Sequence, residues 1–156
     1  MPILASPPHI TSAYTKVDLN RCKEIEHEEE GARYAWRCPG FKSIPLFIQS
    51  DDERIDVDAR MQDNDQIDSL TFDEFPTTVE WRLENGIPFA IIYRLTVANP
   101  DSPKTSRLLV ERIGKEKIMG CRIASIPGAW PKANEIARHI ADTIPSGTAA
   151  CINYKD

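Results

Sequence analysis

The stretch Glu80–Leu95, EWRLENGIPFAIIYRL, decides the fold, because Asn85-Gly86 separates two runs that are rich in apolar and aromatic residues. Asn-Gly between such runs is the strongest short-range signal for a β-hairpin. A two-residue turn would place Arg82 opposite Phe89 and would mix charged with aromatic side chains on one face. We therefore predict a three-residue loop, Glu84–Gly86, whose last residue is left-handed. This register pairs Leu83 with Ile87, Trp81 with Phe89, and Val79 with Ile91.

The segment before this hairpin predicts several more strands. Apolar or aromatic runs cover residues 33–38 and 44–49, and the turn dipeptide Pro39-Gly40 separates them. The run Arg54–Arg60 alternates strictly between apolar and charged residues, so we expect one buried and one solvated face. Residues 61–76 are mostly polar and predict a long irregular loop. In the alternating run, the buried face carries Ile55, Val57 and Ala59, and the solvated face carries Asp56 and Asp58.

The segment near the C-terminus predicts one amphipathic helix. Pro131 suits the first turn of a helix, and Pro145 ends it. On the polar face, Arg138 and Asp142 stand four residues apart, and we expect both to point to solvent. The apolar residues recur at helical spacing on the other face: Ala133, Ile136, Ala137, Ile140, Ala141 and Ile144.

Strands followed by one C-terminal helix imply an α+β domain. Apolar runs at 106–113 and 118–126 add a second hairpin to the sheet. We predict a twisted antiparallel sheet of about six to seven strands, with the helix packed on one face. Because 156 residues is an ordinary size for one domain, we expect a flexible arm at residues 1–13 and a single domain at residues 14–156.

The four cysteines, Cys22, Cys38, Cys121 and Cys151, include no C-x-x-C pair of the kind that binds zinc or exchanges thiols. They allow three disulfide pairings, or they remain buried thiols in a cytosolic protein. We favour Cys22–Cys38 and Cys121–Cys151, because each pair closes a loop of moderate size within one half of the chain. Disulfides that staple the domain predict a periplasmic or secreted protein. The opening residues contain no signal peptide, so we expect a mature chain that has lost its leader.

Several segments carry a resemblance: VDLNRCKEI, WRCPGF followed by IPLFI and DDER, EWRLENGIPFAIIYR, and ANEIARHIAD. Together they resemble a family of small exported bacterial proteins of unassigned function, over most of the chain from Tyr14 to Cys151. The resemblance implies export, two cysteine pairs and a domain of sheet plus helix. It implies no activity and no catalytic residues.

The net charge of −5 is distributed unevenly along the chain. Residues 1–75 hold 16 acids and 8 bases, whereas residues 76–156 hold 8 acids and 11 bases. The acidic half would repel a phosphate backbone, so we expect no binding to nucleic acid. No apolar run reaches the length of a membrane-spanning helix, so we expect no membrane span. Two exposed runs are candidates for a docking surface: Glu28, Glu29, Glu30, Asp51, Asp52 and Glu53.

The sequence contains no recognisable catalytic signature, metal-ligand motif or phosphate-binding loop, and we expect no metal and no cofactor. His9, His27 and His139 lie far apart and accompany no nucleophile motif. The acids at positions 63, 65 and 68 imitate the start of a calcium loop but lack the glycine and glutamate of an EF-hand.

Two functions follow from these observations. The first is a non-enzymatic, inhibitor-like interaction protein that presents the acidic surface to a basic extracytoplasmic partner, with Asp56, Asp58 and Trp130 as further contact residues. The alternative is a small extracytoplasmic hydrolase that uses Asp56 and Asp58 as paired carboxylates. If neither holds, the acidic runs are solubilising loops. The sequence does not identify the partner or the oligomeric state.

Overall fold

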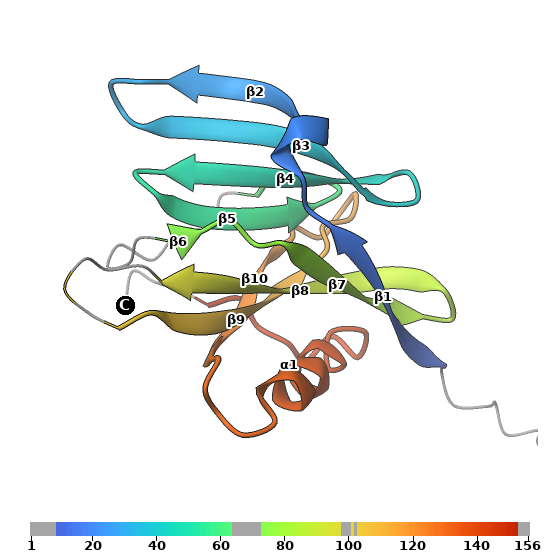
Figure 1. Ribbon diagram of the computed structural model, residues 1–156. Helices are drawn as coiled ribbons and strands as arrows, with labels where there is room; N and C mark the ends of the chain where they lie inside the picture. The colour runs from blue at the N-terminus through green and yellow to red at the C-terminus, as the bar shows by residue number, and fades with distance from the viewer. Residues whose placement is uncertain (1–8, 64–72, 98–100, 102, 153–156) are drawn as a thin grey trace, which may run out of the picture.

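Two antiparallel sheets and one α-helix make up the part of the chain that the computed structural model describes, residues 9–63, 73–97, 101 and 103–152 (Figure 1). Sheet A contains β1 (Ile10–Lys16), β7 (Thr78–Glu84), β8 (Ile87–Val97), β9 (Thr105–Arg112) and β10 (Cys121–Pro127) in this order, with β6 (Asp73–Glu74) paired to β8. Sheet B contains β2 (Lys23–Glu28), β3 (Arg33–Phe41), β4 (Ile44–Asp51) and β5 (Arg54–Ala59) in this order. The short 3-10 helix η1 (Leu19–Arg21) follows β1, and α1 (Ala133–Ala141) follows β10.

The antiparallel α+β class is confirmed, but the prediction of a single sheet is wrong. The chain begins in sheet A with β1, forms all of sheet B, and then returns to sheet A. Figure 1 shows sheet B on one side of sheet A and α1 on the other. The sequence pattern does not separate the sheets, because a buried strand face has the same composition whichever sheet covers it. Strand β1 starts at Ile10, inside the segment that we predicted to be an arm, and residues 1–8 lie outside the described residues.

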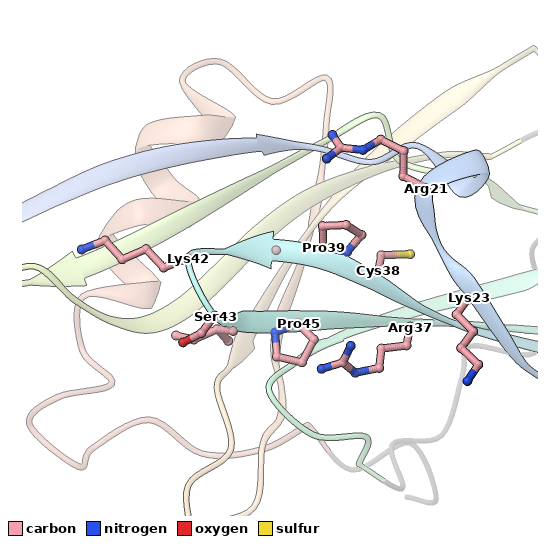
Figure 2. Close-up of a pocket in the computed structure, with 10 residues that line it drawn as sticks. Arg21, Lys23, Arg37, Cys38, Pro39, Lys42, Ser43 and Pro45 are labelled. Carbon is pink, nitrogen blue, oxygen red and sulfur yellow. The ribbon is translucent and has the colours of Figure 1, made fainter.

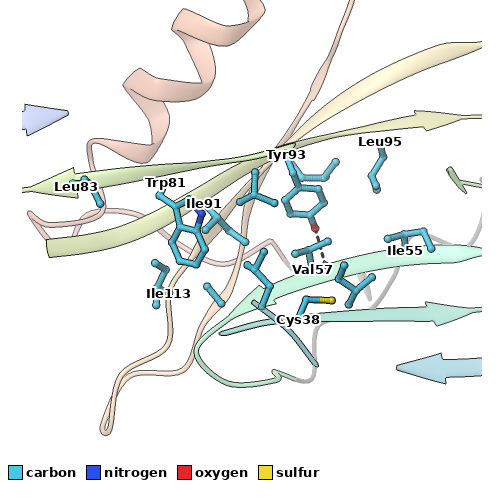
Figure 3. Close-up of a cluster of buried hydrophobic side chains, with 14 residues drawn as sticks. Cys38, Ile55, Val57, Trp81, Leu83, Ile91, Tyr93, Leu95 and Ile113 are labelled. Atoms are coloured by element: carbon cyan, nitrogen blue, oxygen red, sulfur yellow. Dashed lines mark hydrogen bonds between the residues drawn. The ribbon is translucent and has the colours of Figure 1, made fainter. Parts of the chain in front are cut away.

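The larger core lies between the two sheets (Figure 3). Trp81 of β7 is fully buried there, and its indole nitrogen donates to the Thr15 hydroxyl of β1 at 2.8 Å. This bond ties the edge strand of sheet A to the core. Strand β5 contributes alternate residues, as its pattern predicts: Ile55, Val57 and Ala59.

Strand β5 is the edge strand of sheet B, and its outer backbone amides find partners in sheet A. The Val57 amide donates to the Tyr93 hydroxyl at 3.1 Å, as Figure 3 shows. The Ile55 amide donates to the Asp73 carboxylate of β6 at 3.0 Å. Because a buried amide without a partner is costly, these two side chains close an edge that sheet B leaves open.

Helix α1 covers β8, β9 and β10 on the outer face of sheet A. Three small buried residues let its backbone approach the sheet closely: Ala133, Ala137 and Ala141. Arg138 and Asp142, which we predicted to face solvent, instead face sheet A. Arg138 pairs with Glu80 at 2.7 Å, and Asp142 pairs with Arg82 at 2.6 Å. The helix therefore covers the charged side chains of the hairpin, and each of Glu80 and Arg82 has a partner of opposite charge there.

The turn of the β7–β8 hairpin is Asn85-Gly86, one residue shorter than we predicted. Both residues have positive φ, 50° and 82°, as a type I′ turn requires. Beyond the turn, β8 contains one extra residue, Phe89, which has no partner in β7. This bulge places Trp81 opposite Ile91 and sends Phe89 to the core beneath α1. One extra residue moves every later side chain of β8 to the opposite face of the sheet. The bulge therefore keeps apolar and charged side chains on separate faces, which the two-residue turn alone would mix.

Pro39-Gly40, which we predicted to be a turn, lies within β3. The chain turns instead at Lys42-Ser43, between β3 and β4. A β-carbon on Gly40 would lie 2.2 Å from the Ile44 carbonyl oxygen and 3.0 Å from the Trp81 ring. Gly40 is therefore required by the close approach of β4 and Trp81.

Two disulfides staple the fold, and both are the pairs that we favoured. Cys22–Cys38 joins the end of η1, just before β2, to β3, and Cys121–Cys151 joins β10 to the segment after α1. Disulfides persist in oxidising compartments, so their presence suggests an extracytoplasmic protein. Among the described residues, no helix has both the length and the apolar character that crossing a membrane requires.

Gly86 provides a test of the hairpin turn. Its φ is 82° and a β-carbon would meet no atom within 4 Å, so Gly86→Ala introduces backbone strain without a steric clash. We expect the free energy of unfolding to fall by about 1 kcal/mol, measured by urea denaturation. The control is Gly31→Ala, whose β-carbon would meet the flexible end of Glu28 at 3.3 Å. Equal losses in both variants would contradict the type I′ turn.

Candidate functional site

The two acidic runs meet at one end of sheet B, on the left of Figure 1. The first run fills the end of β2 and the turn to β3, and the second fills the end of β4 and the turn to β5. The turns lie side by side, because the Asp52 amide donates to the Ala32 carbonyl at 2.9 Å. The members of this acidic end are Glu28, Glu29, Glu30, Asp51, Asp52 and Glu53.

Arginines at the acidic end neutralise it only weakly. Arg33 lies 3.6 Å from Asp51, and Arg54 lies 3.7 Å from Asp52. Both contacts are long, and both carboxylates are largely exposed. Exposed pairs of this kind contribute little free energy, so the negative potential of the acidic end persists.

His27 is the titratable group beside the acidic end. Its Nε2 lies 3.2 Å from a Glu29 oxygen and its Nδ1 lies 2.5 Å from a Glu24 oxygen. These hydrogen bonds, that of Glu29 first, raise the pKa of His27 above its usual value. As the pH falls through this pKa, His27 gains a positive charge and the acidic end becomes less negative.

The turn between β4 and β5 is strained. Asp52 and Glu53 both have positive φ, 52° and 65°, the region that favours asparagine and glycine. The equivalent turn of the other hairpin is Asn85-Gly86, the sequence that this geometry prefers. A glutamate in the left-handed region costs on the order of 1 kcal/mol. Positive φ at residues other than glycine and asparagine also occurs at Ala32, Lys42, Arg60 and Lys132, and at this turn both residues are acids.

Asp56 and Asp58 do not belong to the exposed acidic surface, which corrects our prediction. Their exposed fractions are 1% and 3%. The alternation in β5 is as predicted, but residues of sheet A cover the face that we expected to be solvated. A substrate in solvent therefore meets neither carboxylate, and this geometry does not support the hydrolase alternative.

Four acids form a buried carboxylate cluster: Asp56, Asp58, Asp63 and Glu111. One carboxylate oxygen from each of the three aspartates lies within 4.8 Å of those of the other two. Arg122 of β10 faces the cluster and donates from Nη2 to Asp56 Oδ1 at 2.9 Å and to the Tyr93 hydroxyl at 3.1 Å. Its Nε lies 3.4 Å from Glu111 Oε1.

Burial dominates the electrostatics of this cluster. Removal from water, and then the neighbouring Asp56 carboxylate, raise the pKa of Asp58 to about 11. The same two causes hold the pKa of Glu111 well above its ordinary range. The Asp63 amide donates to Asp58 Oδ2 at 3.1 Å. Among the described residues, no hydrogen bond reaches Asp56 Oδ2, Asp58 Oδ1 or either oxygen of Glu111.

A basic pocket lies at the opposite end of sheet B (Figure 2). It has a volume of about 340 Å³ and includes the bridged Cys38 in its wall. Four cationic side chains line it: Arg21, Lys23, Arg37 and Lys42. Within the described part of the chain, none of the four forms an ion pair with an acid. Sheet B is therefore negative at one end and positive at the other.

Trp130 is 52% exposed, but the structure does not bring it to the acidic end. It precedes α1 and lines a separate hollow with Arg94 and Lys132. Its exposure is compatible with the predicted role of a contact residue, but Trp130 shares no surface with the acidic runs.

Sequence reasoning missed Glu111, Arg122 and the basic pocket. A signal for Glu111 was present, because Leu109, Glu111 and Ile113 alternate on one face of an apolar run. A charge in the middle of a core face predicts a buried partner. The four cations of the pocket come from η1, β2, β3 and the β3–β4 turn, and no local pattern connects them.

No family model, curated protein or solved structure matches this chain. The resemblance to small exported bacterial proteins therefore stays a prediction. Arguments about function rest on the geometry of the chain itself.

Arg122 holds the buried cluster together, and this can be tested. Arg122→Met leaves the Asp56 carboxylate and the Tyr93 hydroxyl without their cationic donor. We expect the free energy of unfolding to fall by about 3–5 kcal/mol, measured by urea denaturation of the oxidised protein. The control is Arg33→Met, which removes an exposed pair and should cost less than about 1 kcal/mol. Similar losses in the two variants would contradict the structural role of Arg122.

Proposed function

We propose that the protein is an exported, non-enzymatic binding module that docks to a basic partner through the acidic end of sheet B. The observation that carries the proposal is the juxtaposition of two separate acidic runs by the Asp52–Ala32 hydrogen bond. Two turns thereby present one continuous acidic edge, although 20 residues separate Ala32 from Asp52. The two disulfides are consistent with an oxidising compartment outside the cytoplasm.

The distribution of charge supports docking over mere solubility. Solubility favours acids and bases that are interspersed, whereas sheet B gathers six acids at one end, with Arg33 and Arg54 among them, and four cations at the other. This separation of charge gives sheet B an electric dipole, so a basic partner would be attracted to the acidic end and repelled by the basic end. The strained Asp52-Glu53 turn adds an independent argument, since acids occupy positions where glycine or asparagine would stabilise the fold.

Association with a basic partner should be steered by long-range attraction. We expect Glu29→Gln combined with Glu30→Gln to slow association with a lysine-rich or arginine-rich extracellular protein about tenfold at low salt. Triple neutralisation of Asp51, Asp52 and Glu53 should act in the same direction. In 1 M salt the Debye length falls to about 3 Å, and the variants should then associate at the rate of the wild type. Stopped-flow or surface-based kinetics over a salt series gives these rates.

The matched control is Glu116→Gln combined with Glu135→Gln. It changes the net charge equally at two exposed acids outside sheet B. A second control redistributes the acids over the surface at constant net charge. If all variants bind a panel of basic proteins as the wild type does, without saturation, the acidic runs are solubilising loops and the proposal fails.

Two substitutions at Glu53 distinguish the effect of its charge from the effect of its backbone strain. Glu53→Gly relieves the left-handed strain, and we expect the free energy of unfolding to rise by about 0.5–1 kcal/mol while association slows. Glu53→Gln removes the same charge but keeps the strain, so association should slow with little change in stability. Urea denaturation and association kinetics on both variants provide the comparison. If Glu53→Gly is less stable than the wild type, the strain argument is wrong.

A further inference from the structure

The buried carboxylate cluster presents an electrostatic problem that the described protein groups only partly solve. Arg122 pairs with two members of this cluster, Asp56 and Glu111. All four acids are at most 7% exposed, so their ionised forms would repel one another where solvent screens them little. Buried charge of this size has to be neutralised by protons or by a cation.

We propose that Asp56, Asp58 and Asp63 bind a calcium ion. The three carboxylates offer oxygens that lie within 4.8 Å of one another. Oxygens bound to one calcium ion at 2.3–2.6 Å lie within about 5 Å of one another, and the three carboxylates satisfy this limit, so one ion can bind all three. Carboxylate oxygens are hard ligands, which favour calcium, magnesium or manganese and disfavour softer metals such as copper.

The hydrogen bonds within the cluster leave specific oxygens for the ion. Arg122 occupies Asp56 Oδ1, and the Asp63 amide occupies Asp58 Oδ2. The opposite oxygens, Asp56 Oδ2 and Asp58 Oδ1, accept no hydrogen bond from any described residue, although both residues are at least 97% buried. A buried carboxylate oxygen without a donor is rare in a folded protein, and a metal ion removes this cost. The orphaned oxygens are thus an observation independent of the acidity of the cluster.

Calcium fits better than magnesium for two reasons. Magnesium usually retains several waters and requires near-octahedral geometry, whereas these carboxylates are buried and leave little room for waters. Calcium accepts six to eight oxygens with flexible geometry, including bidentate carboxylates. Glu111, the fourth acid of the cluster, stands next to these three aspartates, and neither of its oxygens accepts a hydrogen bond from a described residue.

The site also explains why sheets A and B meet at charged residues. Asp56 and Asp58 belong to sheet B, whereas Glu111 and Arg122 belong to sheet A. Asp63 follows β5 and begins the connection back to sheet A. An ion held by Asp56, Asp58 and Asp63 therefore fixes the end of β5 to the chain that leaves it, next to the residues of sheet A.

The test begins with protein stripped by a chelator and then titrated with calcium at neutral pH. We expect saturable binding of one ion per chain below about 1 mM by calorimetry, and a melting temperature that rises with calcium. Terbium replaces calcium in a second assay, because Tyr93, whose hydroxyl lies 3.4 Å from Asp56 Oδ1, can sensitise its emission. Calcium should displace the terbium and quench this emission.

Two variants locate the ion. Asp58→Asn keeps the acceptor for the Asp63 amide but removes a ligand charge, and we expect calcium affinity to fall at least tenfold. Without calcium this variant should be at least as stable as the wild type, because it removes repulsion between acids. The matched control, Asp52→Asn, makes the same chemical change at an exposed acid and should bind as the wild type does.

Two outcomes would overturn the proposal. If calcium changes neither the calorimetric signal nor the melting temperature of stripped wild-type protein, the cluster is neutralised by protons. If Asp52→Asn loses affinity as strongly as Asp58→Asn, the ion adsorbs to the acidic end. If Asp58→Asn fails to fold, Asp52→Asn still locates the ion, because a loss of calcium affinity relative to the wild type would place it at the acidic end.

Discussion

The unpaired edge of β5 is the constraint on which the arrangement of the two sheets depends. Sheet B ends at this strand, and the strand lies against sheet A, away from water. Its outward amides therefore need acceptors from sheet A, and the Tyr93 hydroxyl and the Asp73 carboxylate supply them. A polar layer between two apolar sheets follows from this requirement. Once the layer is present, it attracts further polar groups, including Arg122, whose Nη2 also donates to the Tyr93 hydroxyl.

Local pattern predicted the elements well and their surroundings poorly. The alternation in β5, the helix stripe with its three alanines, and both cysteine pairs could be read from sequence spacing. Spacing cannot show what covers a face, because that depends on distant parts of the chain. Asp56 illustrates the limit, since its position on β5 was correct but Arg122, 66 residues later, buries it. The bulge at Phe89 was missed for a similar reason. It places Phe89 among apolar residues beneath α1, and this helix lies far along the chain from the hairpin.

The acidic end was predictable as composition but not as a surface. Each run was visible in the sequence, yet their contact depends on the register of β3 with β4, which pairs Arg33 with Asp51. The same register places Lys42 and the basic pocket at the far end of the sheet. Because consecutive antiparallel strands place alternate turns at opposite ends, a meander converts charges that are mixed along the chain into charges that are separated in space. Charge separation in sheet B is thus a product of topology.

The pairing of β1 with β7 sets an order of assembly. Lys16 lies opposite Thr78 and Ile10 opposite Glu84, so the whole of sheet B stands between the two partners in the chain. A chain that ends before residue 78 has no partner for β1, whereas the strands of sheet B are consecutive neighbours. Pairing β1 with β7 closes a long loop and costs conformational entropy. This cost is smaller if sheet B folds first, because less of the loop is then free chain. We therefore expect β1, which precedes the other described strands in the chain, to be among the last strands to pair.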